Sequence, residues 1–209
     1  MGDLLIGGST IPANYILPSL LKTFLGLYPS LRVHMTIGDT DSIIRQVGQG
    51  RLELGIVGSQ PEQQGIASTP LHRDELVMVA APCLTEGKPE PKNLRDLRSW
   101  PWILRERGSG TRRFMETLLK AAGIPISDLR VSLWVESTEA AIQCVRAGLG
   151  VSVVSKLAAQ PHLDRGELVC LDVIAQKLER SFFLIQRQGR ELLPAASLFI
   201  EHVRNATKG

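Results

Sequence analysis

The order of apolar runs along the chain constrains its fold more than any other feature. Short apolar runs typical of buried strands alternate with segments whose apolar residues recur every three or four positions, as in amphipathic helices. In the first part of the chain these runs predict strands at Leu4–Gly7, Leu31–Ile37 and Leu54–Val57, with helices between them. Strand, helix, strand, helix, strand is the pattern of a parallel α/β sheet.

The same pattern then begins again. Strands are predicted at Trp102–Arg105, Leu129–Val135 and Val151–Ser155, again with helices between them. A Ser/Thr loop follows the first strand of each half, at Ser9–Thr10 and at Ser109–Thr111, and a Gly-x-Gly stop follows each second helix, at 48–50 and 148–150. The glycines are offset by 100 residues. We interpret this as a structural repeat, although identity between the halves is low and chance similarity is the alternative.

The middle and the tail add further elements. Ile66–Leu71 and Glu75–Ala80 are predicted as two strands around a turn at His72–Asp74. Residues 86–93, rich in proline and charge, are predicted as a loop and a plausible domain border. Short strands are expected at 168–170 and 182–186, and a last helix from about Pro194, a favourable first-turn residue.

Composition excludes several classes of protein. The 209 residues can bury a core, and a net charge of +3 is too small to indicate a nucleic-acid binder. Three well-separated cysteines fit neither a disulfide framework nor a C-x-x-C metal site, so a reducing cytosol fits best. We see no signal peptide and no membrane span. The first strand is predicted to start at about residue 3, so that nothing precedes the fold. We therefore expect the chain to be cut from a longer protein.

The stretch "RERGSGTRRF" at 105–114 has the composition of an anion-binding loop. It follows a predicted strand and opens a helix, whose first N–H groups carry a partial positive charge. In open α/β sheets, ligands bind where such loops leave the carboxyl ends of the strands. The alternative is that Ser9, Thr10, Ser109 and Thr111 only cap helices.

Catalytic and nucleotide-binding interpretations have less support. The loop lacks the lysine of a P-loop and is not G-x-G-x-x-G, and Ser109 is not in G-x-S-x-G. The four histidines are scattered, and no cluster has metal-ligand spacing. Glu136, at a strand end, is the one acid that could face a ligand, although it could instead pair with Arg105 or start a helix. We therefore predict no catalytic residue, no metal and no cofactor.

These segments together resemble the effector-binding domain of LysR-type transcriptional regulators. The resemblance runs through "GDLLIGGST…ILPSLLKTFLGLYPSLRVHM", "GRLELGIVG", "TPLHRDELVMVAAP", "PWILRERGSGTRRFME", "VESTEAAIQCVRAGLGVSVVS" and "GELVCLDV", and covers almost the whole chain. The single pieces are weak, whereas their order and spacing together are specific.

The resemblance implies an α/β fold of two Rossmann-like subdomains, the type 2 periplasmic-binding-protein fold. Subdomain I would comprise residues 1–79 and 175–209, and subdomain II residues 80–174. Two crossover strands would lie near Leu76–Ala81 and Asp172–Ile174.

By the same resemblance, a small anionic metabolite or oxyanion would bind in the cleft between the subdomains. The residues that match the family's effector contacts are Ser9, Thr10, Ile11, Gly58, Ser59, Ser109, Gly110, Thr111, Glu136 and Ser137. The family often has polar groups where this chain has Ile11 and Pro12, and a hydroxyl where it has Gly58. These departures leave the effector's size and polarity open.

The resemblance also implies partners. The family's N-terminal winged helix-turn-helix domain is absent from this chain, so DNA would be bound only by the longer parent, commonly a tetramer, in the cytoplasm. Effector domains would form an antiparallel homodimer through the first helix and the second-helix region of subdomain II. One alternative is a solute-binding protein of a transport system with the same fold; the parent's first residues would distinguish them. An enzyme on this fold and a surface interaction module are weaker alternatives.

Overall fold

The computed structural model describes residues 2–174 and 177–206 and divides the chain into two compact α/β units. Unit 1 contains the chain up to Arg73 and again from Ser181 onward, and unit 2 is the continuous segment Asp74–Arg180. The expected borders after residues 79 and 174 differ from these, because Leu76, Met78 and Leu178 pack into the core of unit 2. Residue 175, where the expected return to subdomain I begins, lies outside the described residues.

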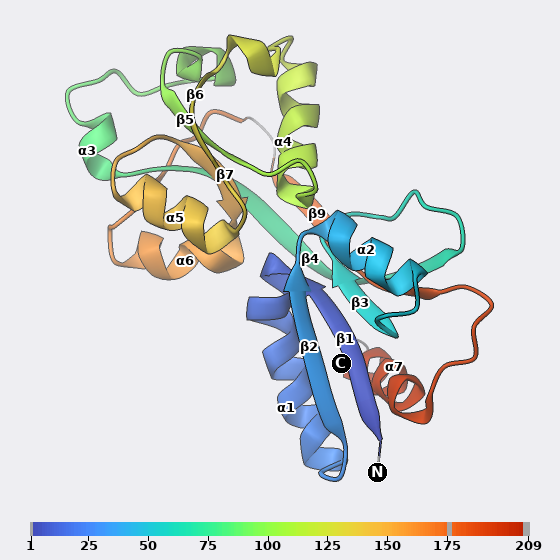
Figure 1. Ribbon diagram of the computed structural model, residues 1–209. Coiled ribbons are helices and arrows are strands. Elements are labelled where there is room, and N and C mark those ends of the chain that lie inside the picture. The colour runs from blue at the N-terminus through green and yellow to red at the C-terminus, as the bar shows by residue number, and fades with distance from the viewer. Residues whose placement is uncertain (1, 175–176, 207–209) are drawn as a thin grey trace. The chain divides into compact units, whose positions relative to one another are not determined.

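Unit 1 is built on a sheet of order β2-β1-β3-β9, in which β1, β2 and β3 are parallel and β9 is antiparallel to β3. Its elements are β1 (Asp3–Ser9), the π-helix η1 (Pro12–Ile16), α1 (Leu17–Leu27), β2 (Arg32–Gly38), α2 (Thr40–Gly48), β3 (Leu54–Val57), the first part of β4 (Ile66–Ala80), most of β9 (Leu178–Arg187) and α7 (Pro194–Ala206). Figure 1 shows β1 between β2 and β3.

Two adjacent glycines allow helices to pack closely on both faces of β1. A Cβ on Gly7 would lie 2.5 Å from Leu52 and 3.0 Å from Ile43 of α2, and a Cβ on Gly8 would lie 2.9 Å from Ala13 of η1. Successive residues of a strand point to opposite faces, so α2 and η1 cover opposite sides of the sheet. The close approach at Gly8 fixes the path of the chain just after β1.

Unit 2 repeats this arrangement, with β4 in the place that β9 takes in unit 1. Its elements are the second part of β4, α3 (Pro82–Thr85), η2 (Leu94–Leu97), β5 (Pro101–Arg105), α4 (Gly110–Ala121), η3 (Ile126–Asp128), β6 (Arg130–Val135), α5 (Thr138–Arg146), β7 (Ser152–Ser155), α6 (Lys156–Asp164), β8 (Val169–Cys170) and the start of β9. β5 is parallel to β6 and bridges to Val151, just before β7, while β4 runs antiparallel to both β7 and β8. The order β6-β5-β7-β4 in unit 2 therefore matches β2-β1-β3-β9 in unit 1.

The predicted repeat is present, but its register is 98 rather than 100 residues. α2 begins at Thr40 and α5 at Thr138, and the residue after each C-cap is a glycine of positive φ, Gly50 at 72° and Gly148 at 77°. A left-handed residue in this position is the usual way to end a helix. Gly150 has another role, because a Cβ there would lie 2.6 Å from the Pro101 carbonyl oxygen.

Several sequence predictions were wrong in detail. The expected turn at His72–Asp74 is the middle of a single 15-residue strand, β4, where the His72 ring stacks on Phe182 of β9. Residues 86–93 form no domain border, because Leu84 and Leu94 on either side pack into one core. The second crossover is β9 rather than Asp172–Ile174, and α6 was not predicted because Pro161 and a weak apolar pattern mask it.

Candidate functional site

In unit 1, five of the predicted site residues lie at one edge of the sheet. Ser9 ends β1, and Thr10 and Ile11 begin the helical segment that continues into η1; all three are buried. Gly58 and Ser59 follow β3. Because β1 and β3 are parallel neighbours, the carboxyl ends of both strands lie at the same edge of the sheet.

Thr40 connects this edge to the start of α2. Its buried Oγ1 accepts a hydrogen bond of 3.4 Å from the Gly58 amide. Asp39 caps the helix by accepting a bond of 2.6 Å from the Ser42 amide. Sequence reasoning did not assign Thr40 to the site.

In unit 2, the Ser109–Gly110–Thr111 loop begins α4. Ser109 is the N-cap, and its Oγ accepts a hydrogen bond of 3.4 Å from the Arg112 amide. Gly110 and Thr111 are the first helical residues, whose N–H groups have no acceptor within a helix. Thr111 Oγ1 accepts a bond of 3.0 Å from Nη1 of Arg180.

Arg180 belongs to a buried network that sequence reasoning missed. Its guanidinium donates to Asp74 Oδ2 at 2.8 Å from Nε, with Nη2 2.7 Å from the same oxygen, and Ser155 donates to Asp74 Oδ1 at 2.7 Å. Burial lowers the pKa of Arg180, and Asp74 opposes that shift. Asp74 stands among polar residues that were predicted to form a turn, and nothing local indicated its partner 106 residues away.

A second buried arginine, Arg105, contacts residues at the start of α4 and of α5. Arg105, which ends β5, donates from Nε and Nη2 to the two carboxylate oxygens of Glu106, each at 2.7 Å, and from Nη1 to Thr138 Oγ1 at 2.7 Å. Its carbonyl oxygen accepts a bond of 3.0 Å from Arg112 of α4. These contacts tie the end of β5 to the starts of both α4 and α5.

Glu136 and Ser137 join β6 to α5 beside that arginine. Arg105 contacts only the backbone carbonyl of Glu136, at 3.5 Å, so the side-chain pair considered from sequence is replaced by the pair with Glu106. Ser137 caps α5 through a bond of 3.0 Å from the Ala140 amide. Because β5 and β6 are parallel neighbours, these two residues and the Ser109 loop lie at one sheet edge.

Three hydroxyls in unit 2 can still donate. The oxygens of Ser109, Thr111 and Ser137 each accept a hydrogen bond from a backbone amide or from Arg180. A hydroxyl that accepts in this way keeps its own hydrogen for a further partner. Such an edge, with helix N-termini beside it, suits an anion better than a cation.

Neither metal chemistry nor membrane insertion has structural support within the described residues. No group of three or more His, Cys, Asp or Glu side chains in 2–174 and 177–206 could hold a metal ion. Over the same residues, every helix is too short or too polar to span a bilayer.

Comparison with known proteins identifies the family. The sequence model described as the LysR substrate binding domain matches residues 1–208. The chain belongs to this family. The resemblance inferred from the sequence motifs is therefore confirmed, and the family is one of transcriptional regulators.

Curated relatives of this LysR domain are longer than the chain. It is 32% identical over 203 residues to the Escherichia coli K12 protein named "Uncharacterized HTH-type transcriptional regulator YeiE", covering 96% of this chain and 67% of that protein. It is 34% identical over 203 residues to a protein of Anaeromyxobacter dehalogenans named "Phosphonates import ATP-binding protein PhnC", covering 97% of this chain and 41% of that protein.

A solved structure confirms the fold. The regulatory domain of CcmR from Synechocystis PCC6803, in complex with 2-PG, superposes with a TM-score of 0.87 at 26% identity, covering 100% of this chain and 99% of that one. The predicted α/β fold of the periplasmic-binding-protein type is thus confirmed, and the transport-protein alternative is not favoured.

Proposed function

We propose that this LysR domain senses a small anionic effector through two sets of residues, one on each unit. Unit 1 contributes Ser9, Thr10, Ile11, Gly58 and Ser59, and unit 2 contributes Ser109, Gly110, Thr111, Glu136 and Ser137. The effector favours one of two states of the longer regulator, and its differential affinity for them supplies the signal.

The observation that carries this proposal is the state of the three hydroxyls in unit 2. Each accepts a hydrogen bond from the protein and so has a hydrogen left for the ligand. A ligand with several acceptor oxygens, such as a carboxylate, phosphate or sulfate, can use all three. The 2-PG complex of CcmR supports a small-molecule ligand for this class of domain.

The charges nearby argue for recognition by dipoles. Arg105 and Arg180 are both buried, and each is already paired with a carboxylate, Glu106 and Asp74 respectively. Hydroxyls and helix N-termini therefore provide most of the attraction. Such a site selects a ligand by the placement of its oxygens as well as by its charge.

The test separates ligand binding from helix capping. Thermal shift of the purified chain is measured against a panel of organic acids and oxyanions that includes 2-PG, because a ligand raises stability by mass action. Ser109→Ala and Thr111→Val remove a hydroxyl and should abolish the shift. Ser109→Asp retains an N-cap acceptor while adding a negative charge, so it should keep the unliganded melting temperature and also lose the shift.

Ser127→Ala is the matched control, since this exposed serine in η3 lies in the same unit and should leave the shift unchanged. If Ser109→Asp responds to ligand like the wild type, Ser109 is only a cap and the site assignment fails. The ligand should also be recovered unchanged after incubation, because we propose that the chain catalyses no reaction.

For the longer parent we propose a cytoplasmic LysR-type regulator that binds DNA through an N-terminal domain and assembles as a tetramer. The effector domains would pair through α1 and the α5 region. Exposed apolar side chains support this: Leu27 of α1 is 65% exposed, and Leu149 after α5 is 47% exposed. Such side chains often mark association surfaces.

Sedimentation of the purified chain tests the pairing. Leu27→Asp and Leu149→Asp should each convert a dimer to a monomer. Leu193→Asp should not, because this leucine, with an intermediate exposure of 55%, lies outside these faces. A wild-type chain that is monomeric at all concentrations, or variants that remain dimeric, would overturn the assignment of these faces.

A further inference from the structure

Arg180 contacts one of the hydroxyls of the proposed effector site. Its side chain is 7% exposed, and Nη1 donates a hydrogen bond of 3.0 Å to Thr111 Oγ1 in the first turn of α4. A guanidinium only donates, so the hydroxyl hydrogen of Thr111 cannot go to Arg180 and is left for another partner. The bond therefore fixes the oxygen and directs its hydrogen away from Arg180.

The guanidinium is itself held on its other side. Nε lies 2.8 Å and Nη2 2.7 Å from Oδ2 of Asp74, whose side chain is fully buried. The other carboxylate oxygen of Asp74 accepts a bond of 2.7 Å from Ser155, the N-cap of α6. Because a guanidinium is planar and rigid, these contacts also set the direction of Nη1. A lysine could keep the charge but not this geometry.

The Asp74–Arg180 pair lies where the chain enters and leaves unit 2. Asp74 is the first residue of that unit, on β4, and Arg180 is its last, on β9. The start of α4 is thus bonded to a residue that is itself paired across these two strands. A threonine in a helix commonly divides between two rotamers, and here the bond from Arg180 favours one of them for Thr111.

We propose that Arg180 is the positioning residue of the effector site in unit 2. It acts through Thr111, holding that side chain in one rotamer with the hydroxyl hydrogen presented to an acceptor oxygen of the anion. Because the hydroxyl then donates, this part of the site favours a fully deprotonated oxyanion such as sulfate. The inference rests on the proposed function and extends it, because it assigns part of the specificity to a residue outside the contact set.

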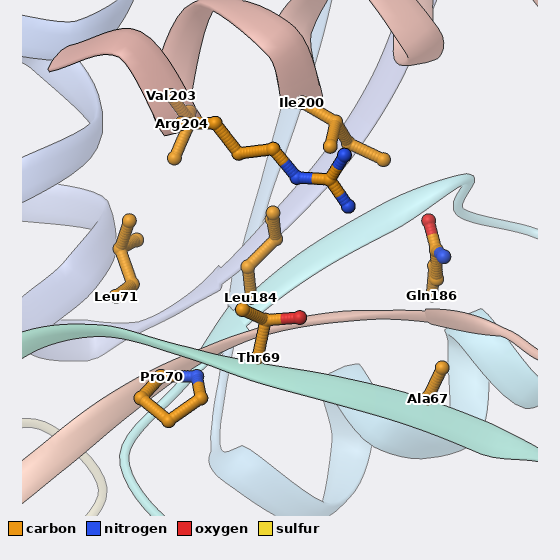
Figure 2. A pocket seen from close by; sticks show the side chains of 9 residues that line it. All are labelled: Ala67, Thr69, Pro70, Leu71, Leu184, Gln186, Ile200, Val203 and Arg204. Carbon is orange, nitrogen blue, oxygen red and sulfur yellow. The ribbon is translucent and has the colours of Figure 1, made fainter. Parts of the chain in front are cut away.

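β9 also supplies a matched control. Gln186, further along the same strand, belongs to unit 1 and lines a hollow with Leu184 and Ile200, as Figure 2 shows. The hollow has a volume of about 50 Å³, which has room for a few water molecules but not for an effector. Oε1 of Gln186 is buried and accepts no hydrogen bond from any described residue. Gln186→Leu should therefore change β9 without changing the Thr111 side chain.

The first measurement needs no ligand. Three-bond NMR couplings from the Thr111 methyl carbon to the backbone nitrogen and carbonyl carbon report its rotamer in the 209-residue chain. Wild type and Gln186→Leu should show one rotamer, and Arg180→Lys should show an average of two. Should Arg180→Lys not fold, the pair Asp74→Asn and Arg180→Gln removes both charges together, so that neither is stranded, and should give the same average.

The second measurement is the affinity for inorganic sulfate, by calorimetric titration. Thr111→Val should bind sulfate at least about tenfold more weakly, because one hydrogen bond is lost, and Arg180→Lys should lose about as much. The double variant should lose no more than either alone, since both changes act on the same bond. Ser137 gives the contrast, because its hydroxyl accepts from the Ala140 amide. Ser137→Ala should weaken binding by the same factor in wild type and in Arg180→Lys.

A single Thr111 rotamer in Arg180→Lys overturns the inference, whatever the chain binds. The inference is also overturned if the losses from Thr111→Val and Arg180→Lys simply add, as those of Ser137→Ala and Arg180→Lys should. If the rotamers behave as expected but wild type binds neither sulfate nor inorganic phosphate, the failure lies in the proposed anion site, and the role assigned to Arg180 falls with it.

Discussion

The two units share one topology but secure their helix starts in different ways. In unit 1 the first residue of α2, Thr40, bonds a backbone amide at 3.4 Å. In unit 2 the equivalent residue, Thr138, bonds the buried guanidinium of Arg105 at 2.7 Å. Unit 2 also has the buried Asp74–Arg180 pair, whereas an ion pair of unit 1, Asp3–Arg32, lies on the surface.

The difference shows that the same topology can hold its helix starts either with backbone contacts or with buried charged groups. Where a helix start is held by a bond to a backbone amide, substitution of the bonded side chain should lower the stability of the fold only slightly. A helix start held by buried charges is stiffer and fails sharply when one partner is removed, because the remaining charge is stranded in the interior. We therefore expect unit 2 to be the less tolerant half of the candidate site.

The largest expected effect is the loss of a buried charge partner. Asp74→Ala leaves Arg180 uncompensated and should lower the free energy of unfolding by about 3–5 kcal/mol. Asp3→Ala, which breaks an exposed pair of similar 2.8 Å length in unit 1, should cost about 1 kcal/mol or less. Denaturant unfolding of both variants measures the contrast, and equal losses would remove it.

The two equivalent threonines test the comparison directly. Thr138→Val takes an acceptor from a buried charged donor and should cost about 1.5–3 kcal/mol, whereas Thr40→Val should cost about 1 kcal/mol. Both substitutions keep the shape of the side chain, so thermal unfolding reports the lost bond. A larger loss for Thr40→Val would reverse our ranking of the two edges.

Substitution of the glycines that end α2 and α5 tests whether the two units are offset by 98 residues. Gly50→Ala and Gly148→Ala both place a Cβ at positive φ and should each destabilise by about 1 kcal/mol. Gly48→Ala, within α2, should cost less than either, because alanine favours the helix and its Cβ would meet only the end of the Gln63 side chain, 3.0 Å away. Similar losses at Gly48 and Gly148, without one at Gly50, would restore the 100-residue register.

The smallest effect concerns a partly buried cluster at the end of α6 in unit 2. His162 bonds the Glu167 carboxylate at 2.6 Å, and this bond together with Arg165 lowers the pKa of Glu167 below its ordinary 4.5. A lowered pKa stabilises the fold above pH 4.5, and that contribution is lost as pH falls through the folded pKa. Wild type should therefore exceed Glu167→Gln in melting temperature at pH 6, with the difference shrinking toward pH 3.

Several elements of secondary structure that depend on local sequence patterns were predicted correctly. The strand at Leu54–Val57 and the helix from Pro194 were predicted at their observed limits or starts, and the Ser109 loop was placed at a helix N-terminus. Partnerships between distant residues were not predictable. Asp74 and Arg180 show no shared local pattern, and the polar triplet His72–Asp74 looks like a turn until the Phe182 ring is seen beside it.

Unit 1 consists of two chain segments separated by unit 2, and this has a consequence for the order in which the units fold. Unit 2 is contiguous and can complete its core soon after leaving the ribosome, whereas unit 1 must wait for β9 and α7 to close a loop that contains all of unit 2. Pulsed hydrogen exchange should find amides of α4 and α5 protected before those of β1 and α7. Unit 1 therefore reaches its final packing only once α7 has docked.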